Sequence, residues 1–439
     1  SLVGSEMCIR DRLDGAEAVY RLRPVTEKKL EQLGMTKLFY EIEMPLCRVL
    51  ADMQEQGFMI DKAALVSFGE SLTGTIAELE RAIYEHAGCE FNINSPKQLG
   101  EVLFDKLLLP AGKKTKTGWS TNADVLEKLR GKHPIVNMVL DYRMLTKLKS
   151  TYADGLLKLI DPDGRIRTKF QMTVTATGRL SSTDPNLQNI PIRKELGSHI
   201  REMFIASKGN VLVDADYSQI ELRLLAHISG DEHMRAAFLS GEDIHTVTAS
   251  QVFNTPVDEV TPLQRSRAKA VNFGIVYGIS PWSLAQDIGV TQGEAKAYMD
   301  AYLNKYDGVR DYMKSIVEKA KQDGYVTTIY SRRRDLPELK SSNFNTRSFG
   351  ERVALNMPIQ GTAADIIKLA MVNVYNRLKA EGLKARLILQ VHDELICECP
   401  ENEAQTVADI LREEMSGAAK LSVPLTVDAK IGHSWAEAH

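Results

Sequence analysis

The spacing of apolar and polar residues changes several times along this chain. From Met44 to Ile160 apolar residues recur at helical intervals, and Asn94-Ser95-Pro96 and Asn122-Ala123-Asp124 each provide a typical helix start. From Arg165 to Val213 the composition shifts to Thr, Ser, Pro and Asn with short β-prone stretches. The pattern therefore predicts an α-rich arm, followed by the beginning of a sheet.

A second change of pattern divides the predicted sheet into two parts. Val211-Leu212-Val213 is typical of a buried strand, helical spacing returns from Glu221 to about Gly382, and Arg386 to Cys399 again has a strand pattern. A long helical insertion thus separates the two strand regions, and we expect these regions to lie together in space. The predicted fold class is α+β.

Composition limits the fold and the cellular setting. The chain has 439 residues, which is too long for one ordinary hydrophobic core, so we expect two or three subdomains. No apolar run reaches the roughly 18 residues that a membrane helix needs. The five cysteines fit neither a zinc site nor a disulfide framework, which favours a reducing cytoplasm. Residues 1–12 join poorly to the helical pattern that follows, and we interpret them as a non-native scar.

Basic residues are clustered locally, although the formal net charge is only −3. A polyanionic partner would have to be bound by such clusters. Taken alone, each cluster is more often a solvated surface than a binding site. The clusters are Lys113, Lys114 and Lys116; Lys147 and Lys149; and Arg332, Arg333 and Arg334.

Acidic residues follow the first predicted strand directly. The strand at 211–213 continues into Asp214-Ala215-Asp216, and Tyr217-Ser218-Gln219-Ile220-Glu221 then leads into a helix. An acid at the end of a buried strand is well placed to hold a metal ion. The alternative is that Asp216 only caps the helix that follows.

The second strand region is predicted to form a tight hairpin, with His392 and Asp393 at its tip between strands at 387–391 and 394–397. Two-residue hairpins favour Asn-Gly or Asp-Gly, so this pair suggests that function has overridden local preference. If the hairpin lies beside the first strand, Asp216 and Asp393 converge and can hold divalent cations.

A third candidate segment is a helix that starts at Thr261-Pro262-Leu263-Gln264, which has the pattern of a capping box. Arg265, Lys269, Phe273 and Tyr277 then recur every four residues. Each step turns the helix by about 400°, so the four side chains line one stripe. Two cations followed by two aromatic rings suit a triphosphate and its base, although an ordinary amphipathic helix is the alternative.

These three segments resemble the signature motifs of family A DNA polymerases, in the same order and with similar separations. The resemblance runs from about Leu38 to His439. The motifs are Asp216-Tyr217-Ser218-Gln219-Ile220-Glu221-Leu222-Arg223, Arg265-x3-Lys269-x3-Phe273-Gly274-x2-Tyr277-Gly278 and Val391-His392-Asp393-Glu394. Further matches are Thr177-Gly178-Arg179-Leu180-Ser181-Ser182, the segment from Asp184 to Pro191, and Arg352-x3-Asn356-x3-Gln360-Gly361-Thr362.

The resemblance implies a right-hand polymerase fold, with an antiparallel palm sheet, helical fingers and a helical thumb. The thumb would take 38–165, the palm 166–228 and 380–439, and the fingers 229–379. Residues 13–37 would be a remnant of the end of an exonuclease-like domain.

The family's chemistry is template-directed addition of deoxynucleoside triphosphates to a primer 3′-hydroxyl, with release of pyrophosphate. By resemblance, Asp216, Asp393 and the carbonyl of Tyr217 would hold two Mg²⁺ ions, for which Mn²⁺ can substitute. Glu394 would be a supporting carboxylate, and Lys269 is the candidate general acid for the leaving group.

The resemblance also assigns residues to each substrate. The incoming nucleotide would be contacted by Arg265, Lys269, Phe273, Tyr277, Gln219, Glu221 and His245. Primer-template DNA would be contacted by Arg179, Asn186, Gln188, Asn189, Arg352, Asn356, Gln360, Gln390 and His392, and its phosphates by Lys147 and Lys149.

Departures from the family pattern are few. The carboxylates of a 3′→5′ exonuclease are missing, so we expect no proofreading by this chain, and Ser331 stands where the family usually has glycine. We expect a monomer with roles in DNA replication and repair, located in the bacterial cytoplasm with the nucleoid and independent of membranes.

Two other functions compete with this reading. A single-subunit RNA polymerase shares the palm, but Glu221 matches the family's gate against a ribose 2′-hydroxyl. A catalytically silent DNA-binding clamp is disfavoured because Asp216, Lys269 and Asp393 are all present.

Overall fold

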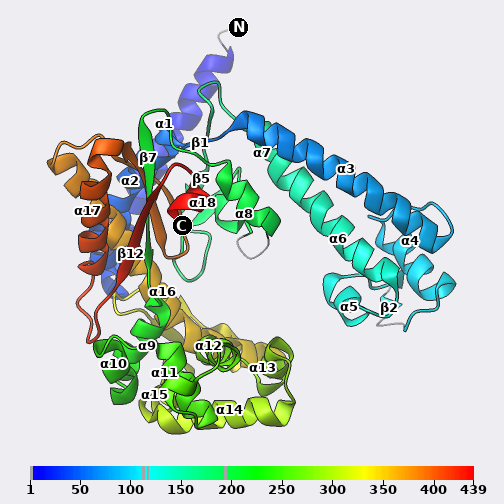
Figure 1. The fold of residues 1–439 in the computed structure, drawn as a ribbon. Helices are drawn as coiled ribbons and strands as arrows, with labels where there is room; N and C mark the ends of the chain where they lie inside the picture. Colours follow the sequence, from blue (N-terminus) through cyan, green and yellow to red (C-terminus); the bar gives the residue numbers. More distant parts are fainter. Residues whose placement is uncertain (1–2, 111–113, 116–117, 192–194) are drawn as a thin grey trace.

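Residues 3–110, 114–115, 118–191 and 195–439 are described by a computed structural model of the chain. A four-stranded sheet lies at the centre, a long helical arm extends from one side of it, and a group of helices lies at one end (Figure 1). This arrangement confirms the predicted α+β class. In the described part of the chain, no helix is both long and apolar enough to cross a membrane.

The central sheet joins strands from distant parts of the sequence. Its order is β10-β11-β7-β12, and all three pairings are antiparallel. The predicted hairpin is β10–β11, and β11 pairs with β7 along the full length of β11, so the expected meeting of the two strand regions is confirmed. The strands are β7 (Asn210–Tyr217), β10 (Arg386–Val391), β11 (Glu394–Pro400) and β12 (Val427–Gly432).

The two faces of the sheet have different partners, because successive side chains of a strand point to opposite faces. On one face, α17 (Ala404–Ser416) packs against β7 and β12, and the hydroxyl of Tyr217 donates a hydrogen bond to the carbonyl of Met415 at 2.7 Å. The face of Asp214 and Asp216 meets the short helix α18 (Trp435–Ala438), which also contacts α8 (Glu195–Glu202).

The helical insertion between β7 and β10 forms the lower part of Figure 1. Its helix α12 begins with the predicted capping box of Thr261 and Gln264. The long helix α16 runs from this group up to the sheet and packs against α17 and β10. The helices are α9 (Ile220–Ser229), α10 (Glu232–Leu239), α11 (Ile244–Phe253), α12 (Pro262–Val276), α13 (Pro281–Ile288), α14 (Gln292–Lys305), α15 (Asp307–Asp323) and α16 (Phe344–Ala380).

The arm is built on the paired helices α3 (Lys62–Ala87) and α6 (Pro134–Leu148). At its tip, α4 (Pro96–Gly100) and α5 (Ala123–Lys128) begin at the predicted caps, Ser95 and Asn122. The tip has a hydrophobic core of its own, separate from the core around the sheet. The preceding η1 (Leu38–Glu43) and α2 (Met44–Gln56) pack instead against α16, and α2 also packs against β10.

Short two-stranded sheets connect these parts. Between the arm and β7, β1 pairs with β4 and β5 pairs with β6, and the hairpin β8–β9 precedes α16. The strands are β1 (Phe58–Met59), β4 (Arg165–Ile166), β5 (Lys169–Gln171), β6 (Ser181–Thr183), β8 (Tyr325–Thr327) and β9 (Arg333–Asp335).

Residues 3–12 belong to one continuous helix, α1 (Val3–Gln32), and their interpretation as a non-native scar stays a prediction. One expectation needs correction. Arg332 is neither a solvated nor a DNA-facing cation. It forms a nearly buried ion cluster with Glu43, Asp365 and Lys368, because four charges in the interior are stable only when they pair.

The remaining basic clusters are only partly described. Lys113 and Lys116 lie outside the described residues, and the ammonium group of Lys114 lies 4.8 Å from the ring centre of Trp119.

Candidate active site

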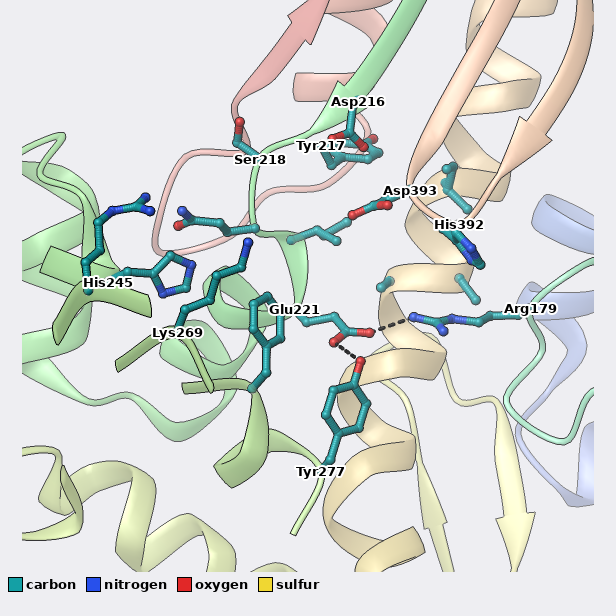
Figure 2. A pocket seen from close by; sticks show the side chains of 17 residues that line it. Arg179, Asp216, Tyr217, Ser218, Glu221, His245, Lys269, Tyr277, His392 and Asp393 are labelled. Atoms are coloured by element: carbon teal, nitrogen blue, oxygen red, sulfur yellow. Dashed lines mark hydrogen bonds and ion pairs between the residues drawn. The ribbon is translucent and has the colours of Figure 1, made fainter. Parts of the chain in front are cut away.

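A cavity of about 590 Å³ lies where the sheet meets the helical insertion (Figure 2). It brings together the three segments that the sequence singled out: the end of β7, helix α12 and the β10–β11 tip. The lining residues are Arg179, Asp216, Tyr217, Ser218, Gln219, Ile220, Glu221, His245, Arg265, Lys269, Phe273, Tyr277, Ala363, Ala364, Ile367, His392 and Asp393.

Asp216 enters the cavity from the end of strand β7. It belongs to the strand, whereas the N-cap position of α9 is taken by Gln219, whose φ is 56° and whose side chain makes no capping hydrogen bond. The alternative that Asp216 only caps the helix is therefore wrong.

Asp393 is brought beside Asp216 by the hairpin tip. His392 has a φ of 50°, the left-handed conformation that tight hairpin turns need and that histidine seldom adopts. The tip is held to β7 by a hydrogen bond of 3.2 Å from the Tyr217 amide to the Asp393 carbonyl, and the Gln390 side chain donates to the His392 carbonyl at 2.7 Å. Backbone contacts thus offset the unfavourable turn.

The two carboxylates form an electronegative centre without a cation. Burial, and next repulsion from Asp393, raise the pKa of Asp216, and burial raises the pKa of Asp393. Among the described residues, no Lys, Arg or His forms an ion pair with either of them. Unpaired buried anions are costly, so this pair suits divalent cations with oxygen ligands.

Cationic and polar groups face these acids from α11 and α12. Figure 2 shows Lys269 reaching into the cavity beside His245, on the side opposite Asp393. Arg265 is 47% exposed and pairs with Asp243 at 2.6 Å. Burial lowers the pKa of His245 to about 4, and its Nδ1 lies 3.0 Å from the amide nitrogen of Asn272. Because that amide is a donor, His245 is neutral with Nε2 protonated and available as a donor.

Glu221 is fixed by two partners at the floor of the cavity. One carboxylate oxygen accepts from Arg179 at 2.6 Å and the other from the hydroxyl of Tyr277 at 2.7 Å (Figure 2). Burial, and next the charge of Glu221, raise the pKa of Tyr277 to about 12, so the phenol stays protonated and donates. Gly178, which precedes Arg179, has a φ of 82°. A Cβ at this position would lie 2.4 Å from Nε of Arg332, which is too close for a non-bonded contact.

Arg179 and His392, which are expected to contact DNA, line the first cavity, and the other residues expected to contact the base pairs occupy three further places. Gln188 donates to the side chain of Gln390 at 3.1 Å beside the hairpin. Asn186 caps a short 3₁₀ helix that ends at Asn189. A second cavity of about 280 Å³ next to Tyr277 is lined by three more of them, Arg352, Asn356 and Gln360.

The arm lysines differ from each other. Lys147 is exposed in the last turn of α6, whereas Lys149 pairs with Asp154 at 2.7 Å. A phosphate contact by Lys149 would therefore require this pair to open.

Glu394 does not line the cavity, although it is paired in register with Asp216. Its oxygens face Trp435 and His439, and His439 also faces Asp214. Asp214, His439 and the Arg265 partner Asp243 were missed in the sequence. Asp214 had a usable signal, since residues two apart on a strand share a face, but the other contacts join distant segments.

Comparison with known proteins agrees with this geometry. A profile described as DNA polymerase family A matches residues 62–437. DNA polymerase I of Bacillus subtilis is 54% identical over 425 residues, covering 96% of this chain and 48% of that protein. The corresponding values for Geobacillus stearothermophilus DNA polymerase I are 52%, 96% and 48%. The chain thus spans about half the length of these curated relatives.

A solved structure gives the same result for the fold. It is described as the POL domain of Pol1 from M. smegmatis in complex with DNA primer-template and dNTP, is 46% identical, and matches with a TM-score of 0.92 over 96% of this chain and 75% of that one. The expected polymerase fold is therefore confirmed, and this chain belongs to DNA polymerase family A.

Proposed function

We propose that this chain is a template-directed DNA polymerase that extends a primer 3′-hydroxyl with deoxynucleoside triphosphates and releases pyrophosphate. The observation that carries the proposal is the convergence of Asp216 and Asp393, neither of which pairs with a cationic side chain of the described residues, opposite Lys269 and Arg265 in one cavity. The M. smegmatis relative was solved with primer-template and dNTP, which supports these substrates.

The triphosphate lies on the α11–α12 side of the cavity in this proposal. Lys269 and Arg265 supply positive charge, and the protonated Nε2 of His245 supplies a neutral donor. Arg265 exchanges its Asp243 contact for phosphate, and Gln219 gives a polar contact beside it. Lys269 Nζ is the group that gives a proton to the departing pyrophosphate.

Asp216, Asp393 and the Tyr217 carbonyl would hold two divalent ions, Mg²⁺ or Mn²⁺. Such ions, when bound, lower the pKa of the primer hydroxyl and neutralise the leaving pyrophosphate. The residues fit these ions, since the two carboxylates are largely buried and have no cationic partner among the described side chains. Glu394 adds negative charge behind them without lining the cavity.

In this proposal, Glu221 selects deoxyribonucleotides over ribonucleotides. Its carboxylate is held by Arg179 and Tyr277, so it cannot move aside cheaply for a ribose 2′-hydroxyl. Phe273 lines the same cavity, where it would offer a flat apolar surface to the deoxyribose.

Duplex DNA would lie along polar residues at the edge of this cavity and beyond it. Minor-groove acceptors are nearly the same for every correct base pair, so side-chain donors there can sense pairing without reading sequence. We assign this contact to Arg179, Asn186, Gln188, Asn189, Arg352, Asn356, Gln360, Gln390 and His392, and phosphate contacts to Lys147 and Lys149.

The proposed division is a thumb at 38–165, a palm at 166–228 and 380–439, and fingers at 229–379. A monomeric state, a cytoplasmic location with the nucleoid, and roles in replication and repair remain predictions.

The proposal is tested by extension of a labelled primer on a DNA template, with Mg²⁺ and with EDTA. We expect Mg²⁺-dependent extension with deoxynucleotides and little with ribonucleotides. Efficient ribonucleotide extension would favour the RNA polymerase alternative, and tight duplex binding without extension would favour the silent clamp.

We also infer that this chain does not proofread, because the exonuclease carboxylates are missing from its sequence. A mismatched primer incubated with the pure protein and Mg²⁺, without nucleotides, should keep its length. Magnesium-dependent shortening would contradict this inference.

A further inference from the structure

Four charged side chains lie behind Asp216 on the same side of the sheet. Asp214, Glu394 and Arg201 are each at most 5% exposed, and His439 reaches them from the end of α18. None of the four lines the cavity that holds Asp216 and Asp393.

His439 is the link between the two acids. Its Nδ1 lies 3.1 Å from Oε2 of Glu394 and 3.4 Å from Oδ2 of Asp214. The other oxygen of Glu394 accepts from the indole nitrogen of Trp435 at 3.2 Å, and neither oxygen of Asp214 has a hydrogen-bond partner among the described residues. The nearest polar groups to both acids therefore include side chains of the segment around α18.

The cluster is balanced in charge without any added ion. The guanidinium of Arg201 stacks on the Trp435 ring, 4.0 Å from its centre, and its attraction to both acids is electrostatic. Close contacts with the carboxylates of Asp214 and Glu394 raise the pKa of His439 to about 9, so the imidazole is cationic at neutral pH. Two anions then face two cations, which explains how Asp214 is tolerated in the interior.

Glu394 is the member of this cluster that could reach the reaction centre. It follows Asp393 directly and is the cross-strand partner of Asp216, and facing residues of paired strands lie on the same side of the sheet. Its carboxylate nevertheless turns away, toward Trp435 and His439.

We propose that His439 is a positioning residue, which holds the Glu394 carboxylate against α18 so that Asp216 and Asp393 alone present carboxylates to the metal ions. This inference rests on the proposed function, but it concerns Glu394 and not the substrates. His439 touches neither the cavity nor the reacting groups, and of the two acids that it contacts we assign its effect on the metal ions to Glu394, which is adjacent to Asp393.

Loss of His439 should strengthen the binding of divalent ions, which is the opposite of what loss of a structural residue would do. A freed Glu394 carboxylate adds a negative ligand next to Asp216, so divalent ions should bind more tightly while extension becomes slower. A purely structural role predicts the reverse for binding, because a loosened sheet weakens any preorganised site.

The test is Mn²⁺ binding to the full chain, measured by calorimetry without DNA, together with single-turnover extension. We expect His439→Gln to lower the Mn²⁺ dissociation constant at least threefold and to slow extension. The control His433→Gln, an exposed histidine of the same segment, should match the wild type. In a Glu394→Gln background, His439→Gln should change neither quantity.

Unchanged or weaker Mn²⁺ binding in His439→Gln, or full additivity with Glu394→Gln, would overturn the inference. His439→Lys, which keeps the positive charge, should behave more like the wild type, and a thermal melt of each variant confirms that it is folded. Failure of the proposed function would look different, since the wild type would then not extend a primer at all.

Discussion

At Glu221, a single carboxylate satisfies a guanidinium and a phenol at once, and both contacts are within 2.7 Å. Two charge-assisted or short hydrogen bonds leave this side chain little freedom. In the proposed function, its rigidity, more than its charge, would exclude a ribose 2′-hydroxyl.

Glu221→Ala should therefore admit ribonucleotides. The ratio of ribonucleotide to deoxynucleotide insertion should rise by about one order of magnitude or more, while normal synthesis slows because Arg179 and Tyr277 lose their partner. Single-turnover insertion opposite one template base measures this ratio. Glu232→Ala, an exposed acid at the start of α10, is the matched control, and an unchanged ratio in Glu221→Ala would place the gate elsewhere.

Phe273 gives the second prediction at this scale. It shares the cavity wall with Arg265 and Lys269 and offers no hydrogen bond. A dideoxynucleotide lacks the 3′-hydroxyl of a normal nucleotide, so a polar group of the site stays unpaired at a cost of about 1–3 kcal/mol. In Phe273→Tyr, the added hydroxyl can make the missing contact, and dideoxy insertion should rise tenfold or more relative to deoxy insertion. Equal selectivity in the two proteins would show that Phe273 only packs.

Individual residues could be predicted where several chemical types fell at one regular spacing, or where an acid stood at the end of a predicted strand or at a hairpin tip. Arg265, Lys269, Phe273 and Tyr277 recur every four residues, and the cavity contains all four. His439 and Asp243 had no such pattern, because their partners lie far away in the sequence and are reached only through the fold.

At the scale of elements, the turn of the β8–β9 hairpin contains a residue in an unfavourable backbone conformation. Ser331 in its turn has a φ of 65°, a conformation that costs a residue with a Cβ about 1 kcal/mol and costs glycine nothing. The position where the family usually has glycine is therefore one where the backbone conformation favours it.

Ser331→Gly should raise the free energy of unfolding by less than about 1 kcal/mol, because relief of this cost is partly offset by the greater conformational freedom of glycine in the unfolded chain. Urea unfolding followed by circular dichroism measures the change. Ser342→Gly, at an exposed bend without positive φ, should give no gain. Equal effects of the two substitutions would show that the turn is not strained.

Elements with strong local signals were predicted well. The capping box at Thr261 and the strand at 211–213 needed only neighbouring residues to be recognised. The packing of α2 against β10 and α16 was not foreseen, since a helical pattern shows that one face is buried but not against what.

Across the whole molecule, one nearly buried ion cluster joins three distant segments. Glu43 lies at the end of η1, Arg332 beside the β8–β9 hairpin, and Asp365 and Lys368 in α16. Lys368 is fully buried and lies 2.8 Å from Glu43. The run of three arginines in the sequence does not indicate that the side chain of the first, Arg332, is nearly buried.

Lys368→Ala should destabilise the protein by about 3–5 kcal/mol. Glu43 would then keep only Arg332 as a cationic partner in this nearly buried cluster. Lys379→Ala should cost under about 1 kcal/mol, since its pair with Asp52 is largely exposed. Urea unfolding of both variants gives the comparison. A small effect of Lys368→Ala would show that water reaches the cluster.

The central claim is that Asp216 and Asp393 hold the ions of a nucleotidyl-transfer site, and single-turnover extension of a pre-bound primer-template tests it most directly. Asp216→Asn and Asp393→Asn keep side-chain size but remove the anion, so each should slow extension by about three orders of magnitude or more while duplex affinity stays within about twofold. Asp428→Asn is the control, because Asp428 is also paired with Asp216 across the sheet but bonds to Ser218. Extension at a rate near that of the wild type, in either of the first two variants at ordinary Mg²⁺, would contradict the account.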